Sequence, residues 1–496
     1  MSQRNKLVLN TITPVAFQVI TIICGFILPR LFIQEYGSNV NGLINSITQF
    51  LAVISFLELG LGSVIQSALY GPLARNDSEK ISAIITSGQK FFRRIAYILL
   101  GYIIVLMFFF PFIIEDQFEW WYTALLIFAI SISTFSQYYF GIIDRLLLNA
   151  DQKGYIQYTV QIVTLLINTI ACIVLIRFGV SIQIVKITTS IIYLARPLVI
   201  RAYINKHYHI NRKFEYAKEP ITQKWNGIAQ HVAFVVLDNT DTLVLTVFSS
   251  LANVSIYAVY NMIVYGIKQL LTASIGGVQA LLGNLIALGE KERINAVFGA
   301  LEFAIHTIVV LVFTCTGVLI VPFVMVYTKG VADINYIQPT FAVLLVCAHA
   351  FHCLRLPYNI AILAGGHYKQ TQSNYIISAI INVVVSIVAV YFYGLVGVAL
   401  GTLIAMGYQT IWMAIYDSKN IVNWPIKKFI KQCLVDCVEI ILIILATSWI
   451  TIIDITYLAW FIMAIKVFSI ALVIVMTISL FLYKEQCKLI FKHFFR

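Results

Sequence analysis

Charged side chains lie inside several long apolar stretches of this 496-residue chain. Glu58 occurs in FLELGLGS, and Asp238 and Asp241 occur in LDNTDTLVL. Lys268 and Arg355 lie in two further stretches. An ionisable group at the centre of a bilayer costs about 2.5–3.5 kcal/mol on insertion scales, so such groups usually have a function. Because arginine binds phosphate oxygens through a fork of donors and lysine acts as a point charge, these residues predict a water-filled cavity that holds an anionic group.

The carboxylates in these stretches have two interpretations. Asp238 and Asp241 are three residues apart, which places both on one face of a helix, where they would balance the cationic cavity or bind a coupling H⁺ or Na⁺. Interhelical ion pairs, with long side chains reaching to the interface, are the structural alternative. The cavity is favoured for Glu58, Asp238, Asp241, Lys268 and Arg355, both interpretations stay open for Arg30, Lys186 and Arg196, and a structural role is favoured for Lys466 and for Glu302 with His306.

Other residue patterns do not predict a catalytic or metal site. His349 and His352 have a spacing that permits metal binding, but no Cys, Asp or Glu on the same helix completes a site. A buried histidine with satisfied hydrogen bonds is the simpler interpretation, with His349 as a secondary contact of the cavity. Asp436 and Glu439 are interpreted as a solvated helix face. We therefore predict no metal, no cofactor and no enzymatic activity.

The composition predicts an all-α polytopic membrane protein. Hydrophobic residues make up 60% of the chain, charged residues make up 11%, and the mean hydropathy is +0.88. Soluble chains carry about 25% charged residues. The eight cysteines show no CxxC spacing, so the sequence predicts neither a disulfide framework nor a zinc site. No cleavable signal peptide is expected, because the first apolar segment is too long for one.

Apolar segments of about 20 residues, enough to cross the hydrocarbon core as helices, recur along the whole chain. The fourteen predicted segments are 8–31, 40–69, 84–114, 121–148, 155–177, 181–203, 226–248, 252–285, 295–327, 337–364, 372–393, 395–416, 430–453 and 457–483.

The net charge of +12 is explained by membrane orientation. With the N-terminus in the cytoplasm, most of the 34 Lys and Arg residues fall in inner loops or at inner segment ends. This is the positive-inside pattern of helical membrane proteins. We therefore predict that both termini are cytoplasmic and that the partners include anionic lipids but no nucleic acid.

An internal repeat appears at a shift of about 214 residues. Asn168 falls on Asn382, and Gly62 falls on Gly276. Because six helices are an even number, the two halves would enter the membrane in the same sense and be related by an axis along the membrane normal, as in transporters with parallel repeats. The predicted domains are an N-lobe (1–204), a cytoplasmic linker (205–225), a C-lobe (226–418), and a final helix pair with a cytoplasmic tail (419–496).

The linker is the longest hydrophilic stretch of the chain, NKHYHINRKFEYAKEPITQKW. Its five Lys and Arg residues are expected to contact anionic head groups, at about 1 kcal/mol each near the surface. It is predicted to be a tether that lets the lobes rock, and its substitutions are expected to matter less than those in the cavity.

The order of several short motifs resembles a known transporter family. The first helix ends ILPRLFIQEYGSNVNGL, the second continues FLELGLGSVIQSAL, and a later stretch reads RLPYNIAILAGGHYKQ before GLVGVALGTLIA. Over essentially the whole chain these resemble the polysaccharide-transport family of the multidrug/oligosaccharidyl-lipid/polysaccharide (MOP) exporter superfamily, which includes O-antigen and capsule repeat-unit flippases. The first helix has fewer arginines than expected of a lipid II flippase.

The resemblance implies a fold, a substrate and a set of contacts. It implies two pseudo-symmetric six-helix lobes, as in MATE and other MOP transporters, plus two C-terminal helices, in a bacterial cytoplasmic membrane. By alternating access the protein would move undecaprenyl-diphosphate-linked oligosaccharides outward for surface polysaccharide synthesis, with glycan polymerase machinery as a further partner. The matching motifs carry Arg30, Glu58 and Arg355 over as cavity residues. An ion-coupled drug or cation antiporter of the MATE type is the alternative, which the Asp238–Asp241 pair supports.

Overall fold

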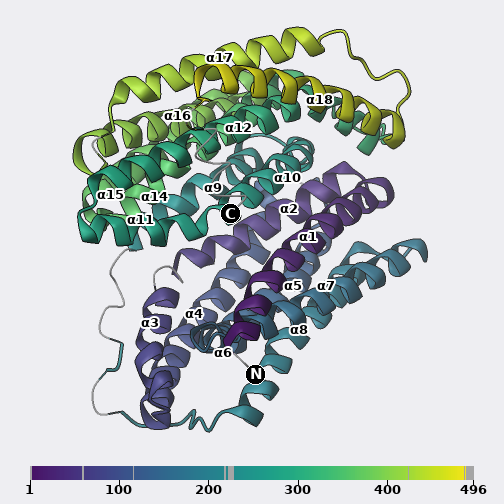
Figure 1. Cartoon of the computed structure of the whole chain (residues 1–496). Coiled ribbons are helices and arrows are strands. Elements are labelled where there is room, and N and C mark those ends of the chain that lie inside the picture. The colour runs from purple at the N-terminus through teal and green to yellow at the C-terminus, as the bar shows by residue number, and fades with distance from the viewer. Residues whose placement is uncertain are drawn as a thin grey trace. The chain divides into compact units, whose positions relative to one another are not determined.

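The computed structural model describes residues 3–57, 61–114, 117–216, 219–221, 228–422, 424–484 and 486. Helices form nearly all of the regular structure in these ranges, and no strand occurs in them (Figure 1). The all-α prediction is therefore confirmed. Ten spans within the described part of the chain are long and apolar enough to cross a membrane.

The chain forms two compact units. The first, called the N-lobe here, comprises Met1–Val235 with Ser250–Ser255, and the second, the C-lobe, comprises Val236–Ser249 with Ile256–Arg496. The helices of the N-lobe are α1 (Gln3–Tyr36), α2 (Ser38–Ala52), α3 (Leu61–Ala74), α4 (Ser78–Ile113), α5 (Trp120–Ser136), α6 (Ile142–Ala150), α7 (Gly154–Arg177) and α8 (Ile182–His207).

The remaining helices belong mainly to the C-lobe. They are α9 (Ile228–Phe248), α10 (Leu251–Ser274), α11 (Gly276–Leu288), α12 (Lys291–Tyr327), α13 (Pro339–Leu354), α14 (Leu356–Ala364), α15 (Tyr368–Tyr393), α16 (Leu395–Asn420), α17 (Ile426–Thr447) and α18 (Tyr457–Leu482). Each of the fourteen predicted segments corresponds to one of these helices or to two consecutive ones.

Several predicted segments are broken where the sequence disfavours a continuous helix. The segment 337–364 divides at Arg355 into α13 and α14, because Pro357 in the first turn of α14 has no backbone N–H to donate. The segment 121–148 contains a π-helical turn at Gln137–Gly141. Such turns insert an extra residue and often occur at functional sites.

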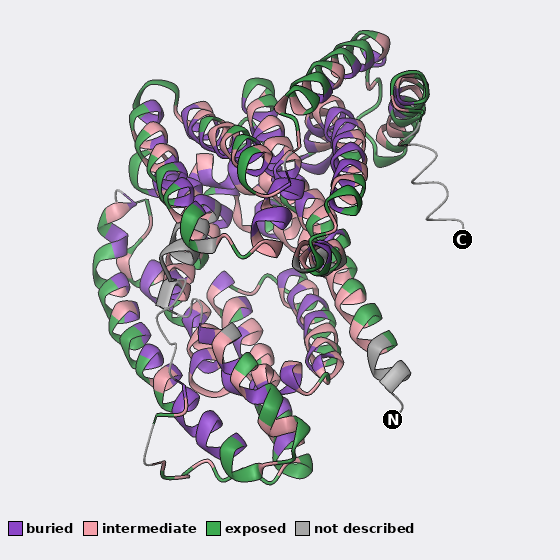
Figure 2. Ribbon diagram, turned by 60° about the vertical axis from the view of Figure 1, so that its left-hand side comes forward, coloured by how far each residue is buried: buried purple, intermediate pink, exposed green. Residues whose placement is uncertain are grey.

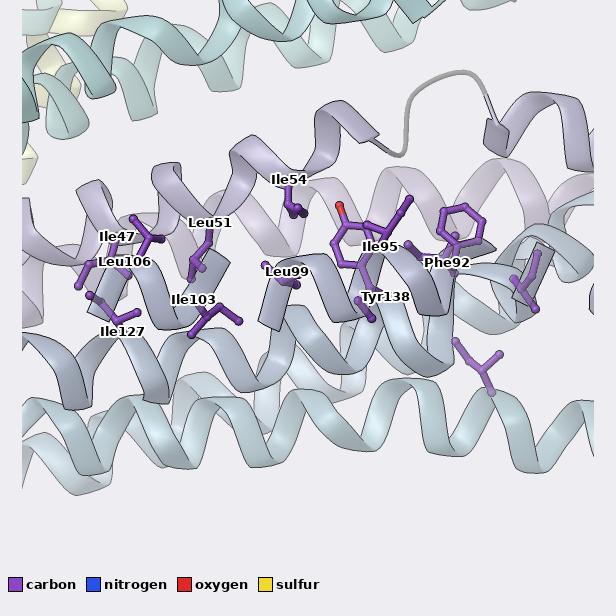
Figure 3. Close-up of a cluster of buried hydrophobic side chains, with 14 of the residues drawn as sticks. Ile47, Leu51, Ile54, Phe92, Ile95, Leu99, Ile103, Leu106, Ile127 and Tyr138 are labelled. Atoms are coloured by element: carbon purple, nitrogen blue, oxygen red, sulfur yellow. The ribbon is translucent and has the colours of Figure 1, made fainter. Parts of the chain in front are cut away.

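The apolar core of the N-lobe lies where α2, α4 and α5 face one another (Figure 3). Ile47 and Leu51 are four residues apart on α2, and Leu99 and Ile103 have the same spacing on α4, so each pair lies on one helix face. These side chains are at most 4% exposed. Ile127 of α5 belongs to the same cluster.

In the C-lobe, α15 and α16 approach closely because small residues line their contact. A Cβ atom on Gly397 would lie 2.2 Å from the Ala389 carbonyl oxygen, and one on Gly401 would lie 2.7 Å from the Ser386 backbone nitrogen. Small residues let membrane helices come this close. The close approach supports the polar contacts described below.

The last two helices, α17 and α18, pack along α12 within the C-lobe (Figure 1). Their contact is apolar, with Val310 of α12, Ile443 of α17 and Val467 of α18 in one buried cluster. Trp460 Nε1 also donates a hydrogen bond to the Leu319 carbonyl over 3.1 Å.

Many helices have an exposed face (Figure 2), and large hydrophobic side chains occupy much of it. Large exposed hydrophobic residues include Phe108, Phe109, Phe112, Ile170, Leu434, Leu458 and Phe481. A water-soluble protein rarely exposes apolar patches of this size, whereas a bilayer provides an apolar solvent for them. The burial pattern therefore agrees with a multi-pass membrane protein.

Candidate functional site

The C-lobe brings three of the predicted cavity residues, Asp241, Lys268 and Arg355, into one buried cluster with His349 and His352. Asp241 from α9, Lys268 from α10 and His349 from α13 line the same small pocket. His352 lines it too, and Arg355 at the α13–α14 break contacts His352. All five are at most 9% exposed. The cluster thus joins residues more than 100 positions apart in the chain, and their role as a substrate site stays a prediction.

Asp241 is the acceptor of a dense set of hydrogen bonds. Thr402 Oγ1 of α16 lies 2.7 and 2.8 Å from its two carboxylate oxygens. Tyr257 OH donates to Oδ2 over 3.0 Å, and Asn382 Nδ2 donates to Thr402 Oγ1 over 3.0 Å. These donors fix the Asp241 carboxylate against α10 and α16, and Asn382 of α15 supports Thr402.

Arg355 and His352 form the cationic side of the cluster. Arg355 Nη2 lies 3.0 Å from His352 Nδ1, and Nη1 lies 3.9 Å from the sulfur of Met406. A guanidinium can only donate, so Nδ1 is the acceptor and the neutral His352 ring carries its proton on Nε2. His349 Nδ1 is buried and has no hydrogen-bond partner among the described residues. His349 is therefore buried as expected, but its Nδ1 lacks the expected hydrogen bond among the described residues.

Among the side chains that the structure describes, the cluster holds more basic than acidic groups. Lys268 and Arg355 outnumber Asp241, and the Lys268 ammonium also lies 4.8 Å from the centre of the Tyr265 ring. The pocket has a volume of about 20 Å³, which is room for about one water molecule. The cluster can hold a water or a small ion inside and can attract an anion electrostatically.

In the N-lobe, two of the predicted cations lie on α8 and contact aromatic rings. Lys186 Nζ lies 4.3 Å from the centre of the Phe32 ring. Arg196 Nε donates to Thr164 Oγ1 over 2.7 Å and stacks on Tyr193 at 3.6 Å. Arg30 is half-buried on α1. Glu58 lies outside the described residues, as does the side chain of Asp238.

A second pocket, in the N-lobe, contains residues that were not predicted as site residues. It has a volume of about 230 Å³ and is lined by Thr48, Thr134, Gln137 and Arg145 together with apolar groups. That volume has room for several water molecules. Gln137 lies on the π-helical turn. From the sequence, Arg145 is expected at the inner end of a predicted segment. No sequence pattern indicates a π-helical turn or a pocket next to it.

One structural expectation from the sequence is wrong. Asp436 and Glu439 were expected on a solvated helix face, but they are 5% and 3% exposed. Both lie on the face of α17 that packs on α12, so solvent cannot reach them. Among the described residues, no group of three His, Cys, Asp or Glu residues has the arrangement of a metal site.

The described part of the linker is docked on helices of the N-lobe. Arg212 Nη2 lies 2.8 Å from Asp144 Oδ1, and Asp144 is fully buried on α6. Arg201 reaches the other carboxylate oxygen at 4.0 Å. Asn211 receives a hydrogen bond from Thr86 Oγ1 and donates one to Ser82 Oγ, both on α4. The linker is thus part of the folded N-lobe.

Both ends of the docked linker are also held. Tyr208 OH donates to Asp151 Oδ2 over 2.5 Å, and burial together with this bond raises the pKa of the Tyr208 phenol. Ser87 Oγ donates to Glu219 Oε1, and Ile221 is 2% exposed. Residues 208–221 are therefore tied to the N-lobe along their described length.

Comparison with solved structures identifies the fold. The lipid II flippase MurJ, in an inward closed conformation, is similar over 95% of this chain and 99% of its own, with 17% identity and a TM-score of 0.70. An inward-facing MATE multidrug transporter of the MOP superfamily is similar over 80% and 94%, with 14% identity and a TM-score of 0.59.

This is the fold of the MOP transporter superfamily. The MATE transporter VcmN from Vibrio cholerae, in its bent form, is similar over 84% of this chain and 98% of its own, with 13% identity and a TM-score of 0.52. No family model and no curated protein matches the sequence. The MOP fold is therefore confirmed, and membership of the polysaccharide-transport family remains a prediction.

Proposed function

We propose that this protein is a flippase that moves undecaprenyl-diphosphate-linked oligosaccharides across the bacterial cytoplasmic membrane by alternating access. The observation that carries the proposal is the buried cluster of the basic residues Lys268, His352 and Arg355 in the C-lobe. Buried positive charge in a membrane attracts an anionic group such as a diphosphate. The likeness of the fold to a lipid II flippase over nearly the whole chain supports the same substrate class.

Each lobe would bind a different chemical group of such a substrate. The C-lobe cluster attracts the diphosphate, and the N-lobe pocket offers Thr134, Gln137 and Arg145 to the hydroxyls and acidic groups of the sugars. The polyprenyl tail remains in lipid, because apolar helix surface faces the membrane on both lobes. The product would serve synthesis of capsule, O-antigen (lipopolysaccharide) or exopolysaccharide, beside glycan polymerase machinery.

Asp241 is the residue through which ion coupling would act near the cationic cluster. Its carboxylate and the Thr402 hydroxyl present oxygen atoms to a pocket with room for one water or small ion. Oxygen ligands suit hard cations, and a carboxylate also binds H⁺. Entry of a cation would offset the charge of Asp241 and leave the cluster more positive toward an anionic substrate.

A variant at Arg355 tests the proposal. Arg355→Ala removes the guanidinium that donates to His352. The variant should lower surface glycan at least tenfold, which corresponds to about 1.4 kcal/mol. The abundance of the protein in the membrane should stay unchanged. Glu58→Gln is expected to act in the same direction. Lys466→Ala is the matched control, since Lys466 is exposed on α18 and should leave glycan at the wild-type level.

A deletion strain separates the proposal from its rivals. Normal surface polymer with no accumulated lipid-linked precursor would refute a flippase. The second candidate, an ion-coupled antiporter of drugs or cations, is favoured by the buried carboxylate of Asp241 and by the MATE-like fold. That candidate requires drug susceptibility to change on deletion and overexpression. Parallel losses of abundance and glycan in Arg355→Ala would assign Arg355 to stability instead.

A further inference from the structure

A second cluster of buried ionisable groups lies in the C-lobe, where α12 packs against α17. His306 of α12 is fully buried, and its Nδ1 lies 2.5 Å from Asp436 Oδ2 of α17. Gln432 Nε2 donates to the other Asp436 oxygen over 3.2 Å. Glu439, three residues along α17 and on the same face, interacts electrostatically with Asp436. Two carboxylates and one imidazole therefore share one dry contact between helices.

Glu302, one turn before His306 on α12, has different surroundings. Tyr358 OH donates to its Oε1 and Trp424 Nε1 donates to its Oε2, each over 2.6 Å. Lys428 lies 3.7 Å from the centre of the Trp424 ring and adds positive charge nearby. Two donors and a cation stabilise the ionised carboxylate. Both oxygens of Glu302 therefore have a hydrogen-bond donor.

Asp436 has His306 and Gln432 beside its two oxygens, whereas Glu439 has no ion-pair partner among the described residues. Neighbouring buried carboxylates do not all ionise, because they repel each other and burial disfavours each charge. No Lys or Arg in the described ranges forms an ion pair with either acid. The other titratable groups near the cluster are Glu302 on α12, Tyr358 on α14, Asp417 on α16, Cys433 on α17 and Tyr483 after α18, with Lys431 over the Tyr483 ring.

Two further atoms indicate that the cluster exchanges protons. His306 Nε2 and Tyr483 OH are both buried, and neither has a hydrogen-bond partner among the described residues. An imidazole that is fully buried, with one nitrogen on a carboxylate and the other unoccupied, can take up or pass on a proton. Apolar side chains would pack α12 against α17 without leaving these polar atoms unsatisfied.

We propose that His306, Asp436 and Glu439 form a proton-binding site. Glu439 carries the exchangeable proton, whereas His306 and Asp436 form a pair without net charge. Loss of this proton leaves two carboxylates beside one imidazole, and the cost of burying the unbalanced charge weakens the contact between α17 and α12. The proton-binding site itself does not depend on the proposed transport function. Only its use by a proton gradient rests on that function.

Infrared spectroscopy of the full-length protein in lipid nanodiscs tests the site directly. Wild-type protein at neutral pH should show the C=O stretching band of a protonated carboxyl. Glu439→Gln should lose the intensity of one carboxyl group from that band. The matched control is Asp454→Asn, in the exposed loop between α17 and α18, which should leave the band unchanged. Equal bands in wild type and Glu439→Gln would overturn the proposal.

A second measurement needs no variant. In wild-type protein made with carboxyl-¹³C glutamate, the band of Glu439 shifts, whereas the bands of buried aspartates such as Asp417 do not. Absence of a shifted band at neutral pH would refute a protonated glutamate, even if Glu439→Gln fails to fold. The result is independent of glycan assays, so failure of the proton site and failure of the flippase proposal are told apart.

Discussion

Asp144 carries a fully buried carboxylate whose charge depends on arginines from two segments. Arg212 of the linker and Arg201 of α8 both approach it. With its amide oxygen facing the arginines, Gln89 accepts hydrogen bonds from Arg201 and Arg93, at 2.8 and 3.0 Å. A buried charge that loses its partner is strongly destabilising. This ion pair therefore makes a single linker residue important for the N-lobe.

Replacing Arg212 by Ala should destabilise the protein by about 3 kcal/mol, since it leaves the Asp144 carboxylate buried with only the more distant Arg201. The expected observation is a lower melting temperature of the purified protein in detergent. Lys213→Ala, an exposed neighbour, should melt like wild type.

A double variant checks the cause. Asp144→Asn combined with Arg212→Ala should cost less than the sum of the two single changes, because the unpaired charge is gone. Additive losses would show that Arg212 stabilises the linker by some contact other than the ion pair.

At the residue scale, the sequence predicted the charged cluster better than its surroundings. Asp241, Lys268 and Arg355 stood out because each interrupts an apolar stretch, and the fold brings them together. Asp436 and Glu439 were misassigned, because two acids near a helix end look solvated until a neighbouring helix is known to cover them. Arg145 was missed, because its pocket depends on a π-helical turn that local patterns do not reveal.

At the element scale, the contact between α15 and α16 makes a prediction about glycine. Gly401→Ala places a methyl group 2.2 Å from Ser386 Oγ and 2.7 Å from its backbone nitrogen. Overpacking of this kind costs about 1–3 kcal/mol. The variant should melt at a lower temperature than wild type and should also disturb the Thr402 hydroxyl beside Asp241.

Gly407, on the same helix, is the control for that substitution. A Cβ atom there meets nothing within 4 Å, and alanine is favoured over glycine within a helix by about 1 kcal/mol. Gly407→Ala should therefore keep or raise the melting temperature. A similar loss in both variants would show that helix propensity, and not the close helix contact, governs this element.

The positions of helices could be predicted well, because apolar segments of spanning length are the strongest signal in such a sequence. Breaks within them were harder to place. Pro357 indicated the break at Arg355, whereas no comparable residue indicated the π-helical turn at Gln137–Gly141. The close approach of α15 and α16 depends on which glycines face each other, and this requires knowledge of the partner helix.

At the scale of the whole molecule, the charge distribution predicts that both termini and the linker are cytoplasmic. In right-side-out membrane vesicles, a membrane-impermeant maleimide should label a cysteine at Asp454, in the exposed α17–α18 loop. It should label a cysteine at Lys206, at the start of the linker, only after the vesicles are opened. The reverse pattern would invert the topology and place Lys428 and Lys431 outside.

The docking of the linker also determines where this polypeptide could be divided. A fragment that stops at residue 204 lacks Arg212. The buried Asp144 carboxylate of that fragment would then have lost this ion-pair partner. A fragment that runs to Ile221 keeps Arg212, Asn211 and Glu219 with the helices they bind. Two separately expressed halves should therefore complement each other only when the cut lies beyond Ile221, so that the first half ends as a finished folding unit.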